Sequence, residues 1–435
     1  MTHRRTFLAR GAGALGVFAL SPAAALAHID GVGRALGTFR GADDEPFWAR
    51  VRRGYALHPR ILNLDNGWTN PAPADAVETV VRHARELEAL PADRLPKIWD
   101  GITDTTVRKA LAGAMGVPPA EIALVRNATE ALDTVLLGLP LKAGDEVVCS
   151  AHDYYAMLDA LDQRRARDGV VVTMLRPPMP APSLEALAAM YEAAIGPRTR
   201  LVLLTHPSNL TGQLLPVARI AAAAHRVGAA VVVDGAQSLG LLADPVKSLD
   251  CDYYGASAHK WLGSPVGLGV LWMRPEHVAK VWPLVPSGAS ARGMGRFEWI
   301  GTTPEYVNPG ALPALALHAT IGAARKAARL RYLGRYWRTR VAGAIPGAKF
   351  YAGDGEEMTT GLALVELPGV DPAPIQKRLF EHDRILVQAM SGERAPEIRG
   401  IRVTPNVYNT PAELDRFVAA LVAAVKAGAG RQAGG

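Results

Sequence analysis

A lysine, a carboxylate and an amide stand close together in this sequence, in an order that suits a covalently held cofactor. Asp234 and Gln237 share one short stretch, and Lys260 ends a Ser-Ala-His-Lys stretch that begins at Ser257. A lysine amine forms a Schiff base with a carbonyl group, and a carboxylate keeps a ring nitrogen protonated so that the ring accepts electrons. Pyridoxal phosphate needs both groups, so we predict that Lys260 tethers this cofactor and acts in catalysis. We also expect Ser257 and His259 to contact it.

A buried parallel strand is the element that must position Asp234. Ala229 to Val233 is an apolar, mostly β-branched run, which is typical of a strand covered on both faces. Open α/β sheets bind ligands at the carboxyl ends of their strands, and Asp234 follows this strand directly. Gln237 lies where the chain then turns, so its amide can donate to the phenolic oxygen of the cofactor. Taken alone, Asp234 fits a helix cap and Lys260 a solvated surface residue, but together they favour the cofactor site.

With these motifs the sequence resembles the class V aminotransferase family of fold-type I pyridoxal-phosphate enzymes, and more closely its isopenicillin N epimerase-like branch. The resemblance runs from about Leu62 to the C-terminal helix. It implies an α/β fold, in which a large domain contains a mostly parallel, seven-stranded sheet and a smaller C-terminal domain is of the α+β type.

Further segments match the family in order. Asn127 to Glu130 follows a strand-like run and opens an apolar helical stretch, so the backbone at Ala128 and the Thr129 hydroxyl can cradle a phosphate at a helix N-terminus. Family members use this turn for the cofactor phosphate. The resemblance also implies that Asn209, which follows the apolar run 201–205, hydrogen-bonds the ring oxygen.

Aromatic residues follow the strand-like run 146–150. His152 stands where relatives stack an imidazole or another ring on the cofactor, and Tyr154 and Tyr155 are alternatives for this role. Gly301 and Thr302 resemble the loop that family dimers send into the phosphate site of the neighbouring subunit. The resemblance therefore implies a homodimer with a shared active site.

Two substrate-binding residues are implied by the same resemblance. Arg402 lies in a strand-like run where relatives bind the substrate α-carboxylate with a planar, two-pronged contact, and Arg399 is the fallback. Asn66 belongs to the segment from Leu64 to Trp68, which is similar to the first substrate-side loop of the family.

The expected reaction begins when the amino group of an amino acid or of a peptide-like molecule displaces Lys260 from the cofactor. The freed Lys260 then removes the α-proton. Transamination, epimerisation and loss of a β-substituent, as in a C–S or β-elimination lyase, all remain open. Cysteine desulfurases of the family need a nucleophilic cysteine before the carboxylate-binding arginine, and Val387 to Arg399 contains none. We therefore predict an aminotransferase or epimerase and not a desulfurase.

Two other classes of protein fit the sequence less well. A non-catalytic exported binding protein with this fold is disfavoured by the intact set of motifs. An exported oxidoreductase lacks a usable dinucleotide motif, because Gly11 to Gly16 has the right spacing but no preceding strand.

The N-terminus predicts export. Arg4 and Arg5 begin a twin-arginine pattern, a weakly hydrophobic run follows, and a small-residue cleavage site ends at Ala27. We expect a Tat signal peptide that engages the Tat translocon, and a periplasmic or otherwise extracytoplasmic mature enzyme. An uncleaved anchor is the alternative, although the apolar run is short for a bilayer.

Composition fits a globular enzyme of 435 residues, 49% of them hydrophobic. The formal net charge is +7, and the three arginines before Ala27 leave +4, which is too mild to predict nucleic-acid binding. The basic run from Arg325 to Arg340 is interpreted as the solvated face of a helix. Cys149 and Cys251 are expected to be free, buried thiols, and the eleven histidines form no metal-spaced cluster.

The chain is divided as follows: 1–27 signal peptide, 28–60 N-terminal arm, 61–315 large cofactor-binding domain, 316–428 small C-terminal domain and 429–435 flexible tail.

Overall fold

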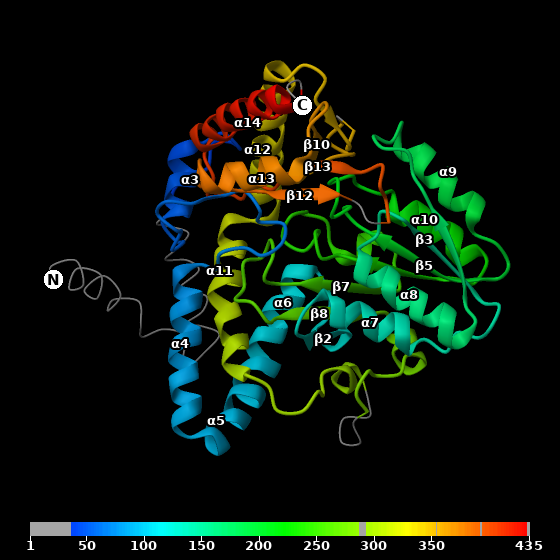
Figure 1. Ribbon diagram of the computed structural model, residues 1–435. Coiled ribbons are helices and arrows are strands. Elements are labelled where there is room, and N and C mark those ends of the chain that lie inside the picture. Colours follow the sequence, from blue (N-terminus) through cyan, green and yellow to red (C-terminus); the bar gives the residue numbers. More distant parts are fainter. Residues whose placement is uncertain (1–35, 287–292, 354, 392–393, 433–435) are drawn as a thin grey trace.

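The computed structural model describes residues 36–286, 293–353, 355–391 and 394–432. The predicted signal peptide lies outside these residues, so export stays a prediction. Figure 1 shows a large α/β domain, with a smaller domain above it that carries the C-terminal helix. Among the described residues no helix is both long and apolar enough to cross a membrane, and no group of acidic, histidine or cysteine side chains is arranged to hold a metal ion.

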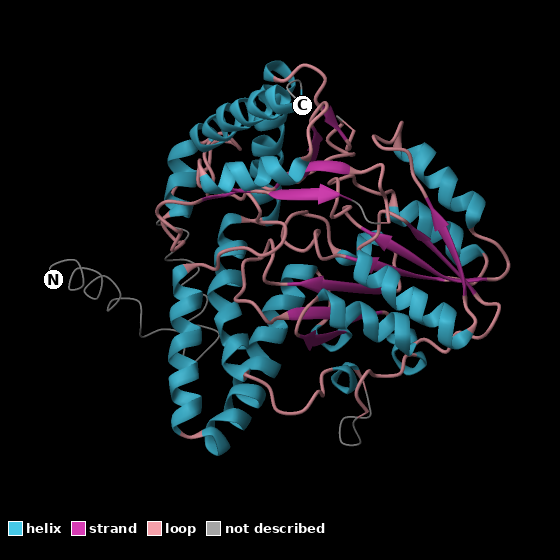
Figure 2. Cartoon of the chain, in the orientation of Figure 1, coloured by secondary structure: helices cyan, strands magenta, loops and turns pink. Residues whose placement is uncertain are grey.

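In the described chain, a seven-stranded sheet forms the large domain, with strand order β2-β8-β7-β6-β5-β3-β4 (Figure 2). Its strands are β2 (Ile122–Val125), β3 (Glu146–Ser150), β4 (Val171–Leu175), β5 (Thr199–Thr205), β6 (Ala230–Asp234), β7 (Tyr253–Ser257) and β8 (Gly269–Met273). Only β8 pairs antiparallel with its neighbours. The predicted fold class is therefore confirmed, and the other six strands end at one edge of the sheet.

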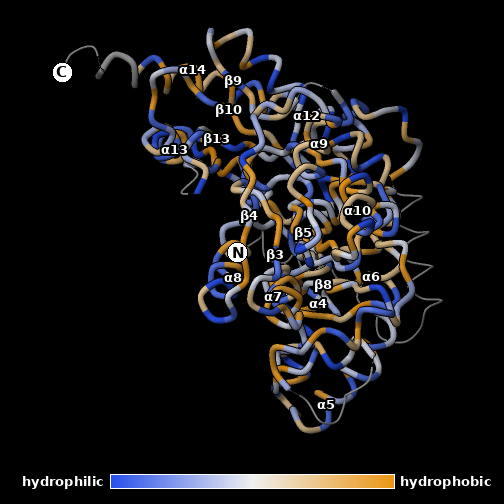
Figure 3. Tube along the Cα trace, turned by 90° about the vertical axis from the view of Figure 1, so that its right-hand side faces the viewer, coloured by the Kyte–Doolittle hydropathy of each residue, from blue (hydrophilic) through white to orange (hydrophobic). Residues whose placement is uncertain are grey.

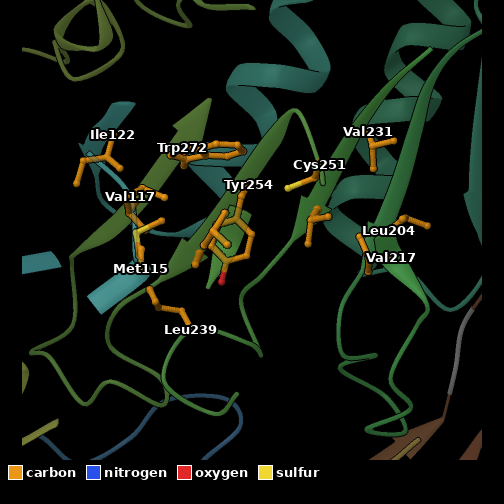
Figure 4. Packing of buried hydrophobic residues seen from close by; sticks show 14 of the residues in the cluster. Met115, Val117, Ile122, Leu204, Val217, Val231, Leu239, Cys251, Tyr254 and Trp272 are labelled. Carbon is orange, nitrogen blue, oxygen red and sulfur yellow. The ribbon is translucent and has the colours of Figure 1, made fainter. Parts of the chain in front are cut away.

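Helices cover both faces of this sheet. Their bounds are α4 (Ala74–Ala89), α5 (Pro91–Ile98), η1 (Trp99–Val107), α6 (Arg108–Met115), α7 (Ala128–Gly138), α8 (Tyr155–Asp168), α9 (Leu184–Ala194), α10 (Val217–Arg226) and α11 (Ala311–Ile321). Side chains of a strand point alternately to opposite faces, so successive valines 231 and 232 of β6 enter different apolar clusters. Figure 4 shows the first cluster, in which Tyr254 and Trp272 lie among aliphatic side chains. Figure 3 shows apolar segments along the strands β3 and β5.

The small domain is built on a four-stranded sheet, with strand order β12-β13-β10-β9 in the described residues. Its elements are α12 (Ala323–Ala344), β9 (Lys349–Phe350), β10 (Ala363–Glu366), α13 (Pro372–Glu381), β11 (Ile385–Leu386), β12 (Gln388–Ser391), β13 (Arg399–Val403) and α14 (Pro411–Gln432). The N-terminal arm adds α3 (Glu45–Arg52) and leads to β1 (Leu62–Asn63), which pairs in parallel with β11. The strand β1 therefore pairs with a strand of the small domain, although it precedes the large sheet in the sequence.

A local sequence signal accounts for the start of α14. The Thr410 hydroxyl accepts from the Glu413 backbone N–H, and the Glu413 carboxylate accepts from the Thr410 N–H, which together form a capping box. Cys149 and Cys251 are free and buried, as the sequence predicts.

The interpretation of the basic run as a solvated face is wrong in part. The helix α12 begins after Gly322, whose φ of +86° separates it from α11, and it buries Lys326, Arg329 and Arg338. Arg329 donates to Glu45 and to the carbonyl oxygens of Ala42 and Asn409. The N-terminal arm and the segment before α14 therefore supply acceptors that helical periodicity cannot indicate.

We predict that Arg329→Met lowers the free energy of unfolding by about 3 kcal/mol, because a buried cation and its partners lose their contacts together. Urea denaturation measures this change. Arg335→Met on the same helix is the control, since the Arg335 side chain is 71% exposed, and we expect it to cost under about 0.5 kcal/mol. Equal effects of the two substitutions would contradict an anchoring role for Arg329.

Candidate active site

A cavity of about 650 Å³ lies at the carboxyl edge of the large sheet and also reaches residues of the small domain. Many residues predicted from the sequence line it: Ala128, Thr129, Asn209, Asp234, Gln237, Ser257, His259, Lys260 and Arg402. They come from the ends of β2, β5, β6 and β7 and from β13. The strand order explains their convergence, because parallel strands end at the same edge.

One end of the cavity is the N-terminus of α7. Asn127 caps this helix by accepting from the Glu130 backbone N–H, and the Ala128 N–H donates to the Ser257 hydroxyl at 2.9 Å. Thr129 belongs to the first turn and lines the cavity. Backbone N–H groups and hydroxyls at a helix start suit a phosphate, because the helix dipole favours an anion there.

Asp234 is a buried carboxylate that keeps too few partners to compensate for its loss of hydration. It accepts from the Ala236 backbone N–H at 2.9 Å, yet burial raises the pKa of Asp234, against the opposing effects of this bond and of Lys260. A protonated ring nitrogen would supply the missing positive charge. This environment fits the predicted role of Asp234.

Lys260 has an amine that loses its proton more readily than an exposed lysine. The pKa of Lys260 is lowered to about 8, chiefly by burial and also by the nearby Arg402, although Asp234 and Asp65 act in the opposite direction. Burial also lowers the pKa of His259 to about 4, so this imidazole is neutral. A neutral amine is the form that attacks a carbonyl group.

Some polar atoms that face this region have no partner among the described residues. They are the Nδ1 atom of His259 and the Oδ1 atom of Asn209. Buried polar atoms usually find a hydrogen-bond partner in the complete molecule. Together with the phosphate cradle, Lys260 and Asp234, these atoms make the cavity a good fit for pyridoxal phosphate.

Arg402 is a buried guanidinium that joins three parts of the chain. It donates to the carbonyl oxygen of Asn209 at 3.0 Å and to the carboxylate of Asp65 at 3.0 Å. Its Nε atom has no partner among the described residues, and the residue lines the cavity. The fallback residue Arg399 is exposed and lies 3.5 Å from Asp371, outside the cavity lining.

The structure places Asn66 away from the cavity, so its substrate contact stays a prediction. Asn66 is fully buried and is not part of the cavity lining. Its amide donates to the Thr404 carbonyl oxygen at 2.8 Å, while its Oδ1 atom accepts from Asn63 and Tyr408. From the same segment, Gly67 and Trp68 line the cavity, and Asp65 accepts from Arg402.

His152 also lies outside the cavity lining. Its Nε2 atom is 3.1 Å from the Glu397 carboxylate, and the lining contains Tyr154 and Tyr155 instead. The tyrosine alternative is therefore the better placed of the two for a ring contact. The contact with Glu397 could not be read from the sequence, because 245 residues separate it from His152.

Asp153 is a wall residue that the sequence did not indicate. Its carboxylate accepts from the backbone N–H groups of Ser150 and Thr205, and burial raises its pKa to about 7. Both oxygens are therefore engaged in fixing the loops after β3 and β5. Its position in the turn that follows the buried strand β3 is the signal that was available.

Thr302 does not reach the Lys260 cavity of its own chain. It is exposed and lines a separate hollow of about 730 Å³ with Arg108, Glu298 and Trp299. This position neither confirms nor contradicts the prediction that Thr302 serves a neighbouring subunit.

Comparison with known proteins agrees with this geometry. Isopenicillin N epimerase of Streptomyces clavuligerus is 31% identical over 406 residues, which are 86% of this chain and 97% of that protein. A probable cysteine desulfurase of Mycolicibacterium paratuberculosis is 30% identical over 346 residues, 74% of this chain and 49% of that protein.

Among solved structures, the C–S lyase C-DES has a TM-score of 0.74 and 25% identity over 85% of this chain and 98% of its own. It was solved as a mutant with glycine covalently linked to its pyridoxal phosphate cofactor.

The family model "Aminotransferase class-V" matches residues 63–417. This match and the cofactor-bound neighbour support pyridoxal 5'-phosphate as the cofactor, as the sequence predicts. The chain belongs to the class V aminotransferase family.

Proposed function

We propose that this protein is an epimerase or an aminotransferase. It acts at the carbon that bears the amino group, either in an amino acid or in a peptide-like molecule. The observation that carries the proposal is that Lys260, Asp234 and Arg402 line one cavity. A base, a carboxylate for the cofactor ring and a cation for the substrate carboxylate are what such chemistry requires.

Each residue has a distinct part in the proposed reaction. Bound pyridoxal phosphate supplies an electron sink for negative charge at the substrate carbon. Lys260 holds the cofactor and, once free, moves the α-proton, which its lowered pKa favours near neutral pH. Asp234 keeps the ring nitrogen protonated. Arg402 binds the carboxylate and thereby turns the α-carbon toward Lys260.

The 31% identity with isopenicillin N epimerase over nearly its whole length supports the epimerase branch. The likeness to the C–S lyase C-DES supports elimination as a second candidate. Persulfide chemistry of the desulfurase kind is disfavoured, because Val387 to Arg399 contains no cysteine. That exclusion stays a prediction.

We further propose that the active unit is an exported homodimer. Exposed Thr302 and Trp299, which is 55% exposed, lie on a face that a second copy could cover, and the twin arginines Arg4 and Arg5 support Tat export. Sedimentation of the purified protein and fractionation of cells test these two points separately.

The experiment that tests the proposed reaction follows the visible absorption of the holoenzyme as amino acids and amino-bearing peptides are added in deuterated water. We expect a substrate to change the spectrum and to acquire deuterium at the α-carbon. Inversion without a keto product indicates epimerisation, keto product indicates transamination, and released sulfur indicates elimination. A spectrum that no compound in the panel changes would contradict the proposal.

Lys260→Ala should abolish both turnover and covalent cofactor attachment. In the unaltered apoprotein, the rate of pyridoxal phosphate incorporation should rise with pH and reach its half-maximum near pH 8, because the neutral amine attacks and the pKa of Lys260 is about 8. Stopped-flow absorbance measures this rate. A midpoint near the ordinary lysine value of 10.5 would show that burial does not activate Lys260.

Arg402→Lys should raise KM by about ten- to a hundredfold while the cofactor spectrum persists, because an ammonium cannot reproduce the two-pronged contact of a guanidinium with a carboxylate. The matched control is Arg399→Lys on the same strand, whose side chain is 50% exposed. Steady-state kinetics measure both variants with the substrate that the absorption experiment identifies. If Arg399→Lys raises KM as much as Arg402→Lys, the assignment of the carboxylate site is wrong.

A further inference from the structure

Trp261, the residue after Lys260, is held at both its backbone and its side chain. It is fully buried, and its carbonyl oxygen accepts from the ammonium group of buried Lys326. Its indole N–H donates to the Oε1 atom of Gln237 at 2.8 Å. One residue therefore connects the cofactor-binding lysine to the amide expected at the cofactor's phenolic oxygen.

The indole identifies which atom of the Gln237 amide group is the oxygen and which is the nitrogen. An indole nitrogen donates and cannot accept, so the atom that receives its hydrogen must be the amide oxygen. The amide nitrogen then carries two hydrogens, and one of them goes to the Gly67 carbonyl oxygen at 2.9 Å. Since Gln237 lines the cavity, the other hydrogen is available to a ligand.

We propose that Trp261 is a positioning residue that holds Gln237 as a hydrogen-bond donor toward the phenolic oxygen of the cofactor. The inference rests on the binding of pyridoxal phosphate in the Lys260 cavity. Without the indole, the amide oxygen loses its donor, and only the Gly67 carbonyl still holds the amide. An amide held at one end can move away from the phenolic oxygen, which then loses its hydrogen-bond donor.

The orientation of this amide has a spectroscopic consequence. The phenolic oxygen of the cofactor also attracts the proton carried by the nitrogen that links it to Lys260. A donor at that oxygen draws off electron density and so weakens its hold on this proton. Loss of the donor therefore raises the pKa of the linkage, and the visible absorption band that reports its protonation changes at a higher pH.

The test is a pH titration of the visible absorption of the holoenzyme without substrate. Trp261→Phe keeps an aromatic ring but removes the N–H, and we expect its midpoint to rise by about half to one pH unit, the equivalent of one hydrogen bond. Trp48→Phe is the matched control. Trp48 is buried in the same apolar cluster, and its Nε1 atom has no partner among the described residues, so its midpoint should not move.

A second pair of variants separates orientation from packing. Gln237→Leu removes the donor and should raise the midpoint by itself, and adding Trp261→Phe should then produce no further shift. An unchanged midpoint in Trp261→Phe, an equal shift in Trp48→Phe, or additive shifts in the double variant would overturn the role of Trp261. Absence of the band from the unaltered holoenzyme would instead refute cofactor attachment at Lys260, so the two failures are distinguishable.

Discussion

A buried guanidinium between the two domains is the contact on which the arrangement of the site depends. Arg402 is 6% exposed, and removing such a group from water is costly unless its hydrogens are bound. Asp65, which follows β1, and the Asn209 carbonyl, which follows β5, supply acceptors from two distant parts of the chain. The arginine of β13 can therefore be buried only where the N-terminal arm and the large sheet both supply acceptors. This place is the cavity that Lys260 also lines.

The same contact sets the electrostatic balance of the cavity. Arg402 lowers the pKa of Lys260, whereas Asp65 and Asp234 raise it. Burial outweighs these opposing charges, so the amine has a pKa of about 8. A substrate carboxylate that binds near Arg402 adds a negative charge beside Lys260, and a negative charge raises the pKa of the amine. Substrate binding at the arginine therefore affects proton transfer at the lysine.

Sequence patterns were reliable where a residue follows directly from a buried strand or a helix cap. The apolar run before Asp234 and the start of α7 at Ala128 both appear where predicted. The sequence indicated less about polar side chains whose partners are distant in sequence. Asn66 is enclosed by Thr404 and Tyr408, and Arg329 by Glu45. Periodicity reports which face of an element is apolar, but it does not report that another segment will deliver acceptors to a basic residue.

Lys260 and Asp234 are assigned to the cofactor and Arg402 is proposed for the substrate carboxylate, so the rest of a substrate would contact the cavity walls. Three large apolar side chains of the lining, Trp68, Tyr155 and Val266, are 66%, 58% and 65% exposed. Exposed apolar surface beside a ligand site favours ligand binding, because a ligand that covers this surface removes it from water. A free amino acid held at Lys260 and Arg402 is short, whereas a peptide-like substrate has additional groups that can cover these side chains. The walls therefore favour the larger of the two proposed substrate classes.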